Sequence, residues 1–444
     1  MPAMRVLYVL HQFFPKFHSG TEQFVLALAR AGRARGDDVR VVALDPDFED
    51  RAPVGATELT WAGVPVTILS FDKDIANWTL REYDAPDLEG PFAAILDDFD
   101  PEVAHVFHLR LFGLDRLYDL DARSIPIAVH VMDFWFVCPN YLLLDRAGNL
   151  CDGPPDGGLG CIECTTPALA QRLRAAGTFD GLRAIEGDVA KHESGDRQRA
   201  LGTLQRADAM RKGLELARRV YAPSHTVADR LVANGHDGSS IVHAPYGVDR
   251  SRFGEAFERR PGPITVGFLG TFAPHKGVDV LVEGFRRLDD PDVRLAVHGR
   301  FGDYREFDER LRHLAGDDER IEFAGPFGRE ELGTVLQGLD IVVVPSRWRE
   351  NTPFVCLEAR IAGIRLLVAD LPGMTEAVPE GRGRAFRAGD PNSLTKALEV
   401  LIGEVRQHGP RLDSDTTIPS IEEQYEQFRR DYAAIASKGG ASTT

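Results

Sequence analysis

Two acidic side chains in the last quarter of the chain have the spacing of a ligand-binding pair. Glu350 and Glu358 follow an apolar, β-branched run over residues 340–344, which predicts a buried parallel strand. Thr352 as N-cap and Pro353 as first helical residue predict a helix, so Glu350 lies in the preceding loop and Glu358 about two turns inside. Unpaired N–H groups at the helix start attract an anionic or hydroxylated ligand, and the carboxylates can accept hydrogen bonds from hydroxyl groups. The alternative is a solvated loop glutamate and an exposed helical one.

The residues around these glutamates form a longer frame, Pro-Ser…Glu-Asn-Thr-Pro…Leu-Glu-Ala, between residues 345 and 359. This frame resembles the signature of the retaining glycosyltransferases of family four. The resemblance implies that Glu350, Asn351 and Thr352 hold the donor sugar. It also implies that Glu358 binds the ribose of the nucleotide.

A second strand–loop–helix junction has a lysine that could bind phosphate. Residues 264–269 read as a strand, and Lys276 stands where the next helix opens. A lone surface lysine is the alternative, but the position resembles the diphosphate site of the family. The family usually adds an arginine earlier in that loop; here none is present, so His275 or Arg300 would have to supply the second positive charge. Gly299 and Arg300 follow the next predicted strand and form a turn on the nucleotide side.

Candidate acceptor-side residues lie in the first half of the chain. Gly20 stands between the first predicted strand and a helix, where a glycine lets backbone approach a ligand closely. His108 ends the predicted strand over residues 100–108. Ligands of open α/β sheets bind at the carboxyl ends of the strands, so we expect both residues near substrate. An ordinary turn glycine and a structural histidine are the alternatives.

The strand predicted over residues 125–132 leads into Asp133 and Trp135. Family members of this subtype usually show His-Asp-aromatic-Trp here, with the histidine beside the donor sugar. Asp133 and Trp135 match, but Met132 stands in the histidine position. His130 lies on the same strand face as Met132, and the sequence leaves open whether it takes over the role.

Four cysteines follow within one segment rich in glycine, proline and aspartate: Cys138, Cys151, Cys161 and Cys164. In a cytoplasmic protein, thiols ending in Cys-x-x-Cys on a polar loop indicate a structural tetrahedral zinc site more than disulfides. Free thiols are the alternative, with an iron–sulfur cluster as a third. A similar loop occurs in some relatives, which implies a role in bracing the acceptor side.

The charge of the chain excludes one class of partner. The net charge of -16 argues against nucleic acid, whose phosphates need clustered basic side chains. It also disfavours broad adhesion to anionic lipid, while a local basic face would still allow peripheral membrane contact. No stretch approaches the ~20 apolar residues of a membrane span, and the N-terminus lacks the features of a secretory signal. A cytoplasmic protein is therefore expected.

The length of 444 residues predicts more than one domain. The resemblance implies an α/β protein of GT-B fold, in which two Rossmann-like domains face each other across a cleft and the C-terminal helix crosses back to the N-terminal domain. The predicted parts are an acceptor-side domain over 1–249, with a cysteine loop at 138–164 and a helical segment at 165–219; a linker over 250–262; a nucleotide-sugar-binding domain over 263–419; and the returning helix over 420–437.

The predicted function is transfer of a sugar from a nucleotide-diphosphate sugar to a hydroxyl acceptor, with the anomeric configuration retained. Lys276 and the helix start before Phe354 would stabilise the leaving diphosphate without a metal, and Glu350 would orient the donor sugar. The acceptor would be a glycan, a lipid-linked sugar or a small molecule, in glycan, polysaccharide or glycoconjugate biosynthesis. The alternatives are a nucleotide-sugar epimerase of the same fold and a non-catalytic nucleotide-sugar-binding subunit.

Overall fold

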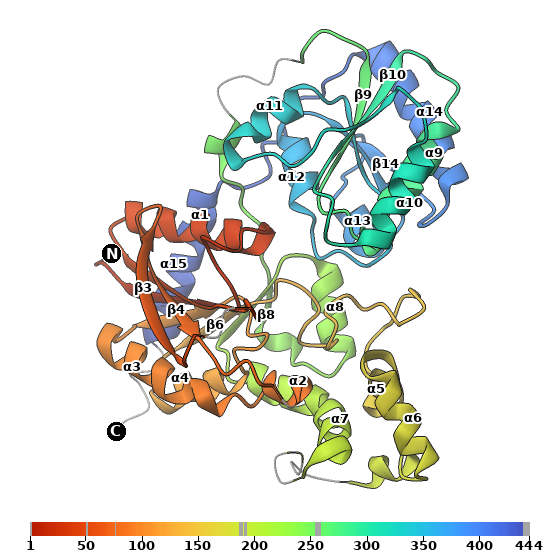
Figure 1. Cartoon of the computed structure of the whole chain (residues 1–444). Coiled ribbons are helices and arrows are strands. Elements are labelled where there is room, and N and C mark those ends of the chain that lie inside the picture. The colour runs from red at the N-terminus through yellow and green to blue at the C-terminus, as the bar shows by residue number, and fades with distance from the viewer. Residues whose placement is uncertain are drawn as a thin grey trace. The chain divides into compact units, whose positions relative to one another are not determined.

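The computed structural model describes residues 2–49, 52–75, 77–185, 190, 193–253 and 259–437. The chain divides into two compact units, Met1–Pro245 with Ile421–Thr444 (unit 1) and Tyr246–Ser420 (unit 2). Figure 1 shows a sheet with helices on both faces in each of them. Residues 254–258 of the predicted linker lie outside the described residues.

Unit 1 is built on an eight-stranded sheet with the order β3-β4-β2-β1-β5-β6-β7-β8. Neighbouring strands are parallel except for β3, which pairs antiparallel with β4 at the edge. The strands are β1 Arg5–Leu10, β2 Asp38–Leu44, β3 Gly55–Trp61, β4 Val64–Ser70, β5 Val103–Val106, β6 Ile127–His130, β7 Arg219–Ala222 and β8 Ile241–His243. β5 and β6 are buried at every residue, as central strands covered by helices on both faces must be.

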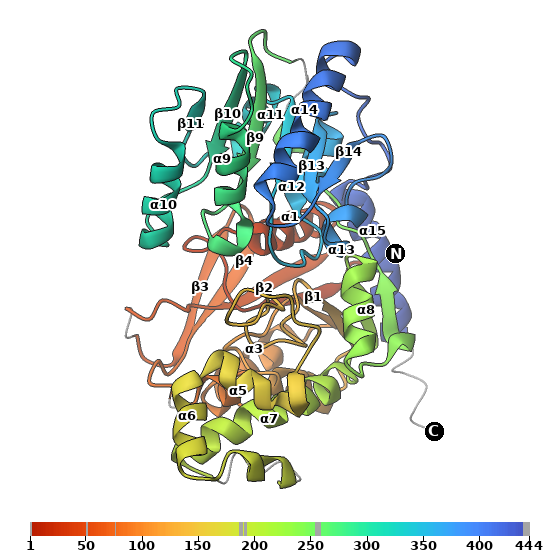
Figure 2. The ribbon, with the colours of Figure 1, turned by 90° about the vertical axis from the view of Figure 1, so that its right-hand side faces the viewer.

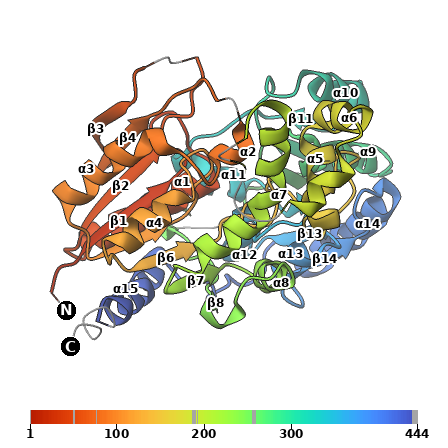
Figure 3. The same cartoon turned by 90° about the horizontal axis from the view of Figure 1, so that it is seen from below.

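The helices of unit 1 cover both faces of this sheet. α1 and α15 lie on one face, and α3, α4 and α7 lie on the other, which Figure 3 turns toward the viewer. They are α1 Gly20–Ala34, α2 Trp78–Arg81, α3 Glu89–Phe99, α4 Asp115–Ala122, α5 Leu159–Thr165, α6 Pro167–Ala175, α7 Gly195–Leu214, α8 His225–Ala233 and α15 Ile421–Ser437.

Unit 2 contains a six-stranded, wholly parallel sheet in the order β11-β10-β9-β12-β13-β14. Its strands are β9 Ile264–Leu269, β10 Val293–His298, β11 Ile321–Phe323, β12 Ile341–Val344, β13 Arg365–Ala369 and β14 Gly383–Phe386. α9, α10 and α14 lie on one face, and α11 and α12 on the other (Figure 2). The helices are α9 Val278–Arg286, α10 Arg305–Ala315, α11 Leu332–Gln337, α12 Phe354–Ile361, α13 Pro372–Glu376 and α14 Pro391–His408.

The C-terminal helix returns to unit 1, which confirms the predicted crossing. α15 packs on α1, where the Tyr425 ring lies against Gly32 so closely that a Cβ there would overlap it. Arg429 Nε donates to Asp37 Oδ2 at 2.7 Å, and Tyr425 donates to the same oxygen at 2.7 Å. A buried ion pair with a further hydrogen bond fixes this helix in one position on the sheet.

The boundary between the units lies at residue 245, whereas the sequence predicted residue 249. Tyr246–Phe253 belong to unit 2 because their side chains pack there: the Tyr246 ring stacks on Phe354 at 4.5 Å, and Arg252 pairs with Glu358.

Within the described residues, no helix is both long and apolar enough to cross a membrane.

Candidate active site

The carboxylate of Glu350 is the centre of a polar cluster in unit 2. It lies in the loop between β12 and α12 and is 4% exposed. Its Oε1 accepts hydrogen bonds from Lys276 Nζ at 2.7 Å, Ser346 Oγ at 2.7 Å and Trp348 Nε1 at 2.8 Å. The Lys276 ammonium also lies 5.2 Å from the centre of the Trp348 ring, within cation–π range. All three bonds converge on one oxygen of the carboxylate.

Lys276 reaches this cluster because two neighbouring strands end beside each other. β9 and β12 are paired in the sheet, and the loops after them meet at its carboxyl edge. Arg347 N–H donates to the His275 carbonyl oxygen at 2.8 Å across these loops. Gly277 has φ of +69°, and a Cβ on it would lie 2.0 Å from the Pro345 carbonyl oxygen. Only glycine allows the lysine loop to approach the glutamate loop this closely.

The helix after Glu350 begins one residue later than predicted. α12 starts at Phe354, and Pro353, not Thr352, occupies the N-cap position, without a side-chain cap. The backbone N–H of Thr352 instead donates to the side-chain oxygen Oδ1 of Asn351 at 2.6 Å. Asn351 Nδ2 donates to Tyr246 Oη at 3.0 Å. The short helix is therefore held by the polar loop before it and by Tyr246.

Glu358 lies on α12 and is 7% exposed. Its Oε1 accepts a hydrogen bond from Arg252 Nη1 at 3.1 Å. Burial raises the pKa of the Glu358 carboxyl, and the neighbouring Arg252 guanidinium opposes this shift. A buried carboxylate beside a cation is able to accept hydrogen bonds from ribose hydroxyls.

A second positive charge near Lys276 was expected from His275 or Arg300. Burial and the charge of Lys276 lower the pKa of His275 to about 4, so its imidazole is neutral at pH 7. Arg300 is largely exposed and pairs with Asp303 at 3.0 Å. Gly299 lies where the predicted turn was placed, and a Cβ on it would lie 2.3 Å from the Gly270 carbonyl oxygen.

In unit 1 the structure brings His108 and Asp133 together. His108 Nε2 lies 3.1 Å from Asp133 Oδ2, and Arg110 N–H donates to His108 Nδ1 at 3.1 Å. The backbone bond makes Nδ1 the acceptor, so Nε2 carries the proton and donates to the aspartate. Asp133 Oδ1 in turn accepts from Trp135 N–H at 2.8 Å. This network gives the imidazole one tautomer and one orientation.

Sequence reasoning left four polar residues at the end of β1 and the start of α1 out of the candidate site: His11, Gln12, Ser19 and Glu22. His11 is half-buried, with its ring centroid 4.2 Å from that of His108, and desolvation lowers the pKa of His11 well below its usual value. Glu22 is fully buried and accepts from Gln12 Nε2 at 3.1 Å and from Ser19 Oγ at 2.5 Å. Gly20, predicted near substrate, is the first residue of α1. The sequence did offer one signal for Glu22: it is an acidic residue in the first turn of a predicted helix, where the helix dipole favours a carboxylate.

His130 contacts other residues than those of the His108–Asp133 pair. β6 ends at His130, so Met132 lies beyond the strand, not on one strand face with it as predicted. The His130 ring packs against aromatic rings of Phe24, Phe107 and Phe428 in the core. Burial lowers the pKa of His130 to about 3. A neutral core histidine is the role that these contacts support.

The four cysteines predicted to bind zinc are all half-buried. Burial, and then the neighbouring thiol groups of the other three, raise the pKa of Cys161 to about 12. Cys151 Sγ donates to the Gly153 carbonyl oxygen at 3.0 Å, and Asn140 Nδ2 donates to Cys164 Sγ at 3.7 Å. In the described chain no three of these sulfurs all lie within 4.8 Å of one another. Four cysteine sulfurs are a set of ligands that suits zinc. In this structure, Cys151 and Cys164 form hydrogen bonds with neighbouring groups of the chain.

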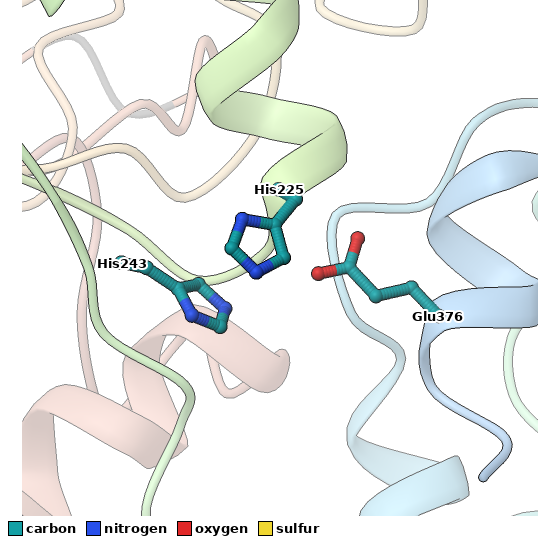
Figure 4. Close-up of side chains that lie close together, drawn as sticks. All are labelled: His225, His243 and Glu376. Atoms are coloured by element: carbon teal, nitrogen blue, oxygen red, sulfur yellow. The ribbon is translucent and has the colours of Figure 1, made fainter.

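Two further histidines of unit 1 form a stacked pair. His225 begins α8 and His243 ends β8; their ring centroids are 4.1 Å apart (Figure 4). Both are exposed. Figure 4 also labels Glu376, the last residue of α13 in unit 2. We assign this pair no role.

Comparison with known families matches both halves of the chain. Residues 19–247 match the family described as glycosyl transferase 4-like domain, and residues 263–404 match the family described as glycosyl transferases group 1. Gly20, His108 and Asp133 fall in the first match. The Lys276–Glu350 cluster and Glu358 fall in the second.

Curated relatives share part of the chain. A D-inositol 3-phosphate glycosyltransferase of Nocardia farcinica is 32% identical over 206 residues, covering 40% of this chain and 46% of the relative. Another, of Geodermatophilus obscurus, is 30% identical over 254 residues, covering 49% and 56%. The chain thus spans about half the length of the curated relatives it matches.

Solved structures share the fold over nearly the whole chain. The catalytic domain of starch synthase IV from Arabidopsis thaliana, bound to ADP and acarbose, has a TM-score of 0.61 at 13% identity and covers 98% of this chain and 100% of that one. Anabaena Alr3699/HepE in complex with UDP and glucose has a TM-score of 0.59 at 14% identity, covering 98% of both chains. These likenesses confirm the predicted GT-B fold.

Proposed function

The chain belongs to the glycosyl transferase 4-like family, and from this premise we propose that it transfers a sugar from a nucleotide-diphosphate sugar to a hydroxyl acceptor with retention of configuration. The observation that carries the proposal is the convergence of Lys276, Trp348 and Ser346 on one oxygen of Glu350, at the edge where β9 and β12 end. Open α/β sheets bind their ligands at such an edge.

Different residues of unit 2 would bind the diphosphate, the sugar and the ribose of the donor. The Lys276 ammonium and the N–H groups at the start of α12, near Phe354, would bind the diphosphate and stabilise the charge that develops as it leaves. The second oxygen of Glu350 would accept a hydrogen bond from the donor sugar. Asn351 and Thr352 would hold the same sugar, and Glu358 the ribose. Gly299 and Arg300 would line the nucleotide side.

The reaction proposed is a substitution on one face of the sugar. The bond between the anomeric carbon and the diphosphate oxygen breaks, and the acceptor hydroxyl oxygen bonds to that carbon from the same face. The hydroxyl proton passes to the departing diphosphate. Neither a covalent sugar–enzyme intermediate nor a catalytic metal is part of this proposal.

Unit 1 would bind the acceptor. His108 holds the Asp133 carboxylate in one orientation through a hydrogen bond at 3.1 Å, and the Asp133 side chain, which is 21% exposed, would accept hydrogen bonds from acceptor hydroxyl groups. Gly20 begins the helix whose first turn holds the buried Glu22. Acceptors to test are glycans, lipid-linked sugars and small polyols, including inositol phosphates, which the names of the curated relatives suggest. The expectation of a cytoplasmic enzyme in glycan, polysaccharide or glycoconjugate synthesis stays a prediction.

The test is a thermal-shift screen against nucleotide sugars, followed by product analysis with the ligands that raise the melting temperature. Glycoside together with free nucleoside diphosphate supports the transferase. Isomerised nucleotide sugar without any glycoside would indicate an epimerase, and binding without any product would indicate a non-catalytic subunit.

We further propose that the segment 138–164 holds one structural zinc. Cys138, Cys151, Cys161 and Cys164 would supply a tetrahedral set of thiolates. The support is that four half-buried cysteines lie in one short segment, the last two in a Cys-x-x-Cys spacing on α5. The ion would brace the loop and take no part in sugar transfer.

A further inference from the structure

The first segment of unit 2 contacts the glutamate motif at both ends. Tyr246 is fully buried, its ring stacks on Phe354 at 4.5 Å with 26° between the planes, and its Oη accepts from Asn351 Nδ2 at 3.0 Å. Further along the same segment, Arg252 Nη1 bonds to Glu358 Oε1 at 3.1 Å. The segment and α12 therefore hold each other in place around the donor-binding glutamate.

The Arg252–Glu358 pair is mostly removed from water. The two side chains are 18% and 10% exposed. Arg252 Nε is buried and, within the described part of the chain, has no hydrogen-bond acceptor. A buried ion pair that leaves one donor unsatisfied contributes little net stability, because desolvation offsets the attraction. Such a pair is better explained by what it does for Glu358.

We propose that Arg252 is a positioning residue for nucleotide binding: it holds one oxygen of Glu358 so that the other is presented to the ribose hydroxyls. The proposal rests on the proposed function, in which Glu358 binds the ribose. Arg252 itself need not touch the ligand. Tyr246 supports it by fixing the start of the segment on Phe354 and Asn351.

The electrostatics of the buried site agree with this role. Burial raises the pKa of the Glu358 carboxyl, and Arg252 is the neighbour that opposes this shift. The Cys356 thiol on the same helix also interacts with Glu358, and burial raises the pKa of this thiol, so it is neutral. Without Arg252 the pKa of Glu358 rises further. The carboxyl then becomes protonated at a higher pH, where it no longer offers the same acceptor to ribose.

The test is calorimetric titration of the full chain with UDP, GDP and ADP, continued with whichever nucleotide binds the parent protein. The variants are Arg252→Gln, Arg252→Lys and, as a matched control, Arg250→Gln. Arg250 lies in the same helical turn, but its Nη2 donates to the Ile418 carbonyl oxygen and not to Glu358. Circular dichroism and melting temperature establish that each variant is folded.

Arg252→Gln should weaken nucleotide binding roughly tenfold, the loss expected for one charge-assisted contact acting through its partner. The loss should grow as the pH falls from about 8 to about 6, because the carboxyl of Glu358 then takes up a proton in the variant before it does in the parent. Arg252→Lys should recover much of the affinity, and Arg250→Gln should bind like the parent.

Two results would overturn the inference alone. One is Arg252→Gln binding the nucleotide like the parent at both pH values. The other is an equal loss in Arg252→Gln and Arg250→Gln without any change in pH dependence, which would show a merely structural segment. If the parent protein binds no nucleoside diphosphate, the proposed function itself fails, and the inference fails with it.

Discussion

Replacing Lys276 by alanine is expected to have two separable effects, because Lys276 pairs with Glu350 and is proposed to bind the diphosphate. With ligand bound, the ammonium is expected to form a charge-assisted hydrogen bond to the diphosphate, and loss of such a bond costs ~1.5–3 kcal/mol. That corresponds to roughly a ten- to hundredfold weaker affinity for the nucleoside diphosphate. Without ligand, Lys276 is the cation paired with Glu350 at 2.7 Å.

The second effect is on stability. Glu350 has a side-chain exposure of 5%, so its carboxylate without Lys276 keeps only the bonds from Ser346 and Trp348. We expect the variant to lose about 1–3 kcal/mol of unfolding free energy. In a domain of this size that lowers Tm by about 2–4 °C for each kcal/mol. The two effects are measured separately, by thermal unfolding and by calorimetric titration well below Tm.

Lys396→Ala is the matched control, because Lys396 is an exposed lysine on α14 of the same unit. It should change neither affinity nor Tm. If Lys276→Ala is folded and binds the nucleoside diphosphate as tightly as the parent and Lys396→Ala do, Lys276 does not contact the diphosphate and the donor site is misplaced.

Three further predictions concern Glu350, the four cysteines of the segment 138–164, and His130. Because Glu350 is proposed to bind the transferred sugar, Glu350→Gln should lower turnover while leaving affinity for the bare nucleoside diphosphate within a few-fold of the parent. Steady-state kinetics and calorimetry would measure the two effects separately, and an equal loss of turnover and affinity would contradict the prediction. Metal analysis of protein purified without chelator should find about one zinc per chain, and Cys161→Ser should lower that content; metal-free protein with all its loop thiols open to alkylation in the native state would refute the zinc site. Burial lowers the pKa of His130 to about 3, so this histidine is neutral in the folded protein, whereas in the unfolded chain it takes up a proton near pH 6.5. The free energy of unfolding should therefore fall as the pH drops below about 6.5, by up to ~1.4 kcal/mol per pH unit for this group. Denaturation at several pH values should show a weaker pH dependence for His130→Phe, whose turnover should be unchanged.

The parallel strands and the glutamate loop were predictable because their signals are local. The run of valines in β12 and the strand–loop–helix pattern around Lys276 depend on neighbouring residues alone. β3 was missed: it is a half-exposed antiparallel edge strand, joined to β4 by Ala62 and Gly63 with positive φ. Its polar alternation gives a weaker signal than a buried strand.

The residues that hold the site in place were not predictable from spacing. Trp348 lies within the motif, but only the folded loop shows that its indole N–H reaches Glu350. Arg252 is 106 positions from Glu358 along the chain, and Tyr246 is 105 from Asn351. No local pattern encodes such pairs, because they depend on how the segment before β9 packs on α12.

The most direct measurement of the central claim is product analysis of the parent protein with a nucleotide sugar that binds it and a panel of hydroxyl acceptors. Mass spectrometry would detect the glycoside, and the coupling of its anomeric proton in the NMR spectrum would give its configuration. The proposed function predicts glycoside and nucleoside diphosphate in equal amounts, with the anomeric configuration of the donor. Inverted glycoside would contradict retention, and epimerised nucleotide sugar with no glycoside would contradict sugar transfer itself.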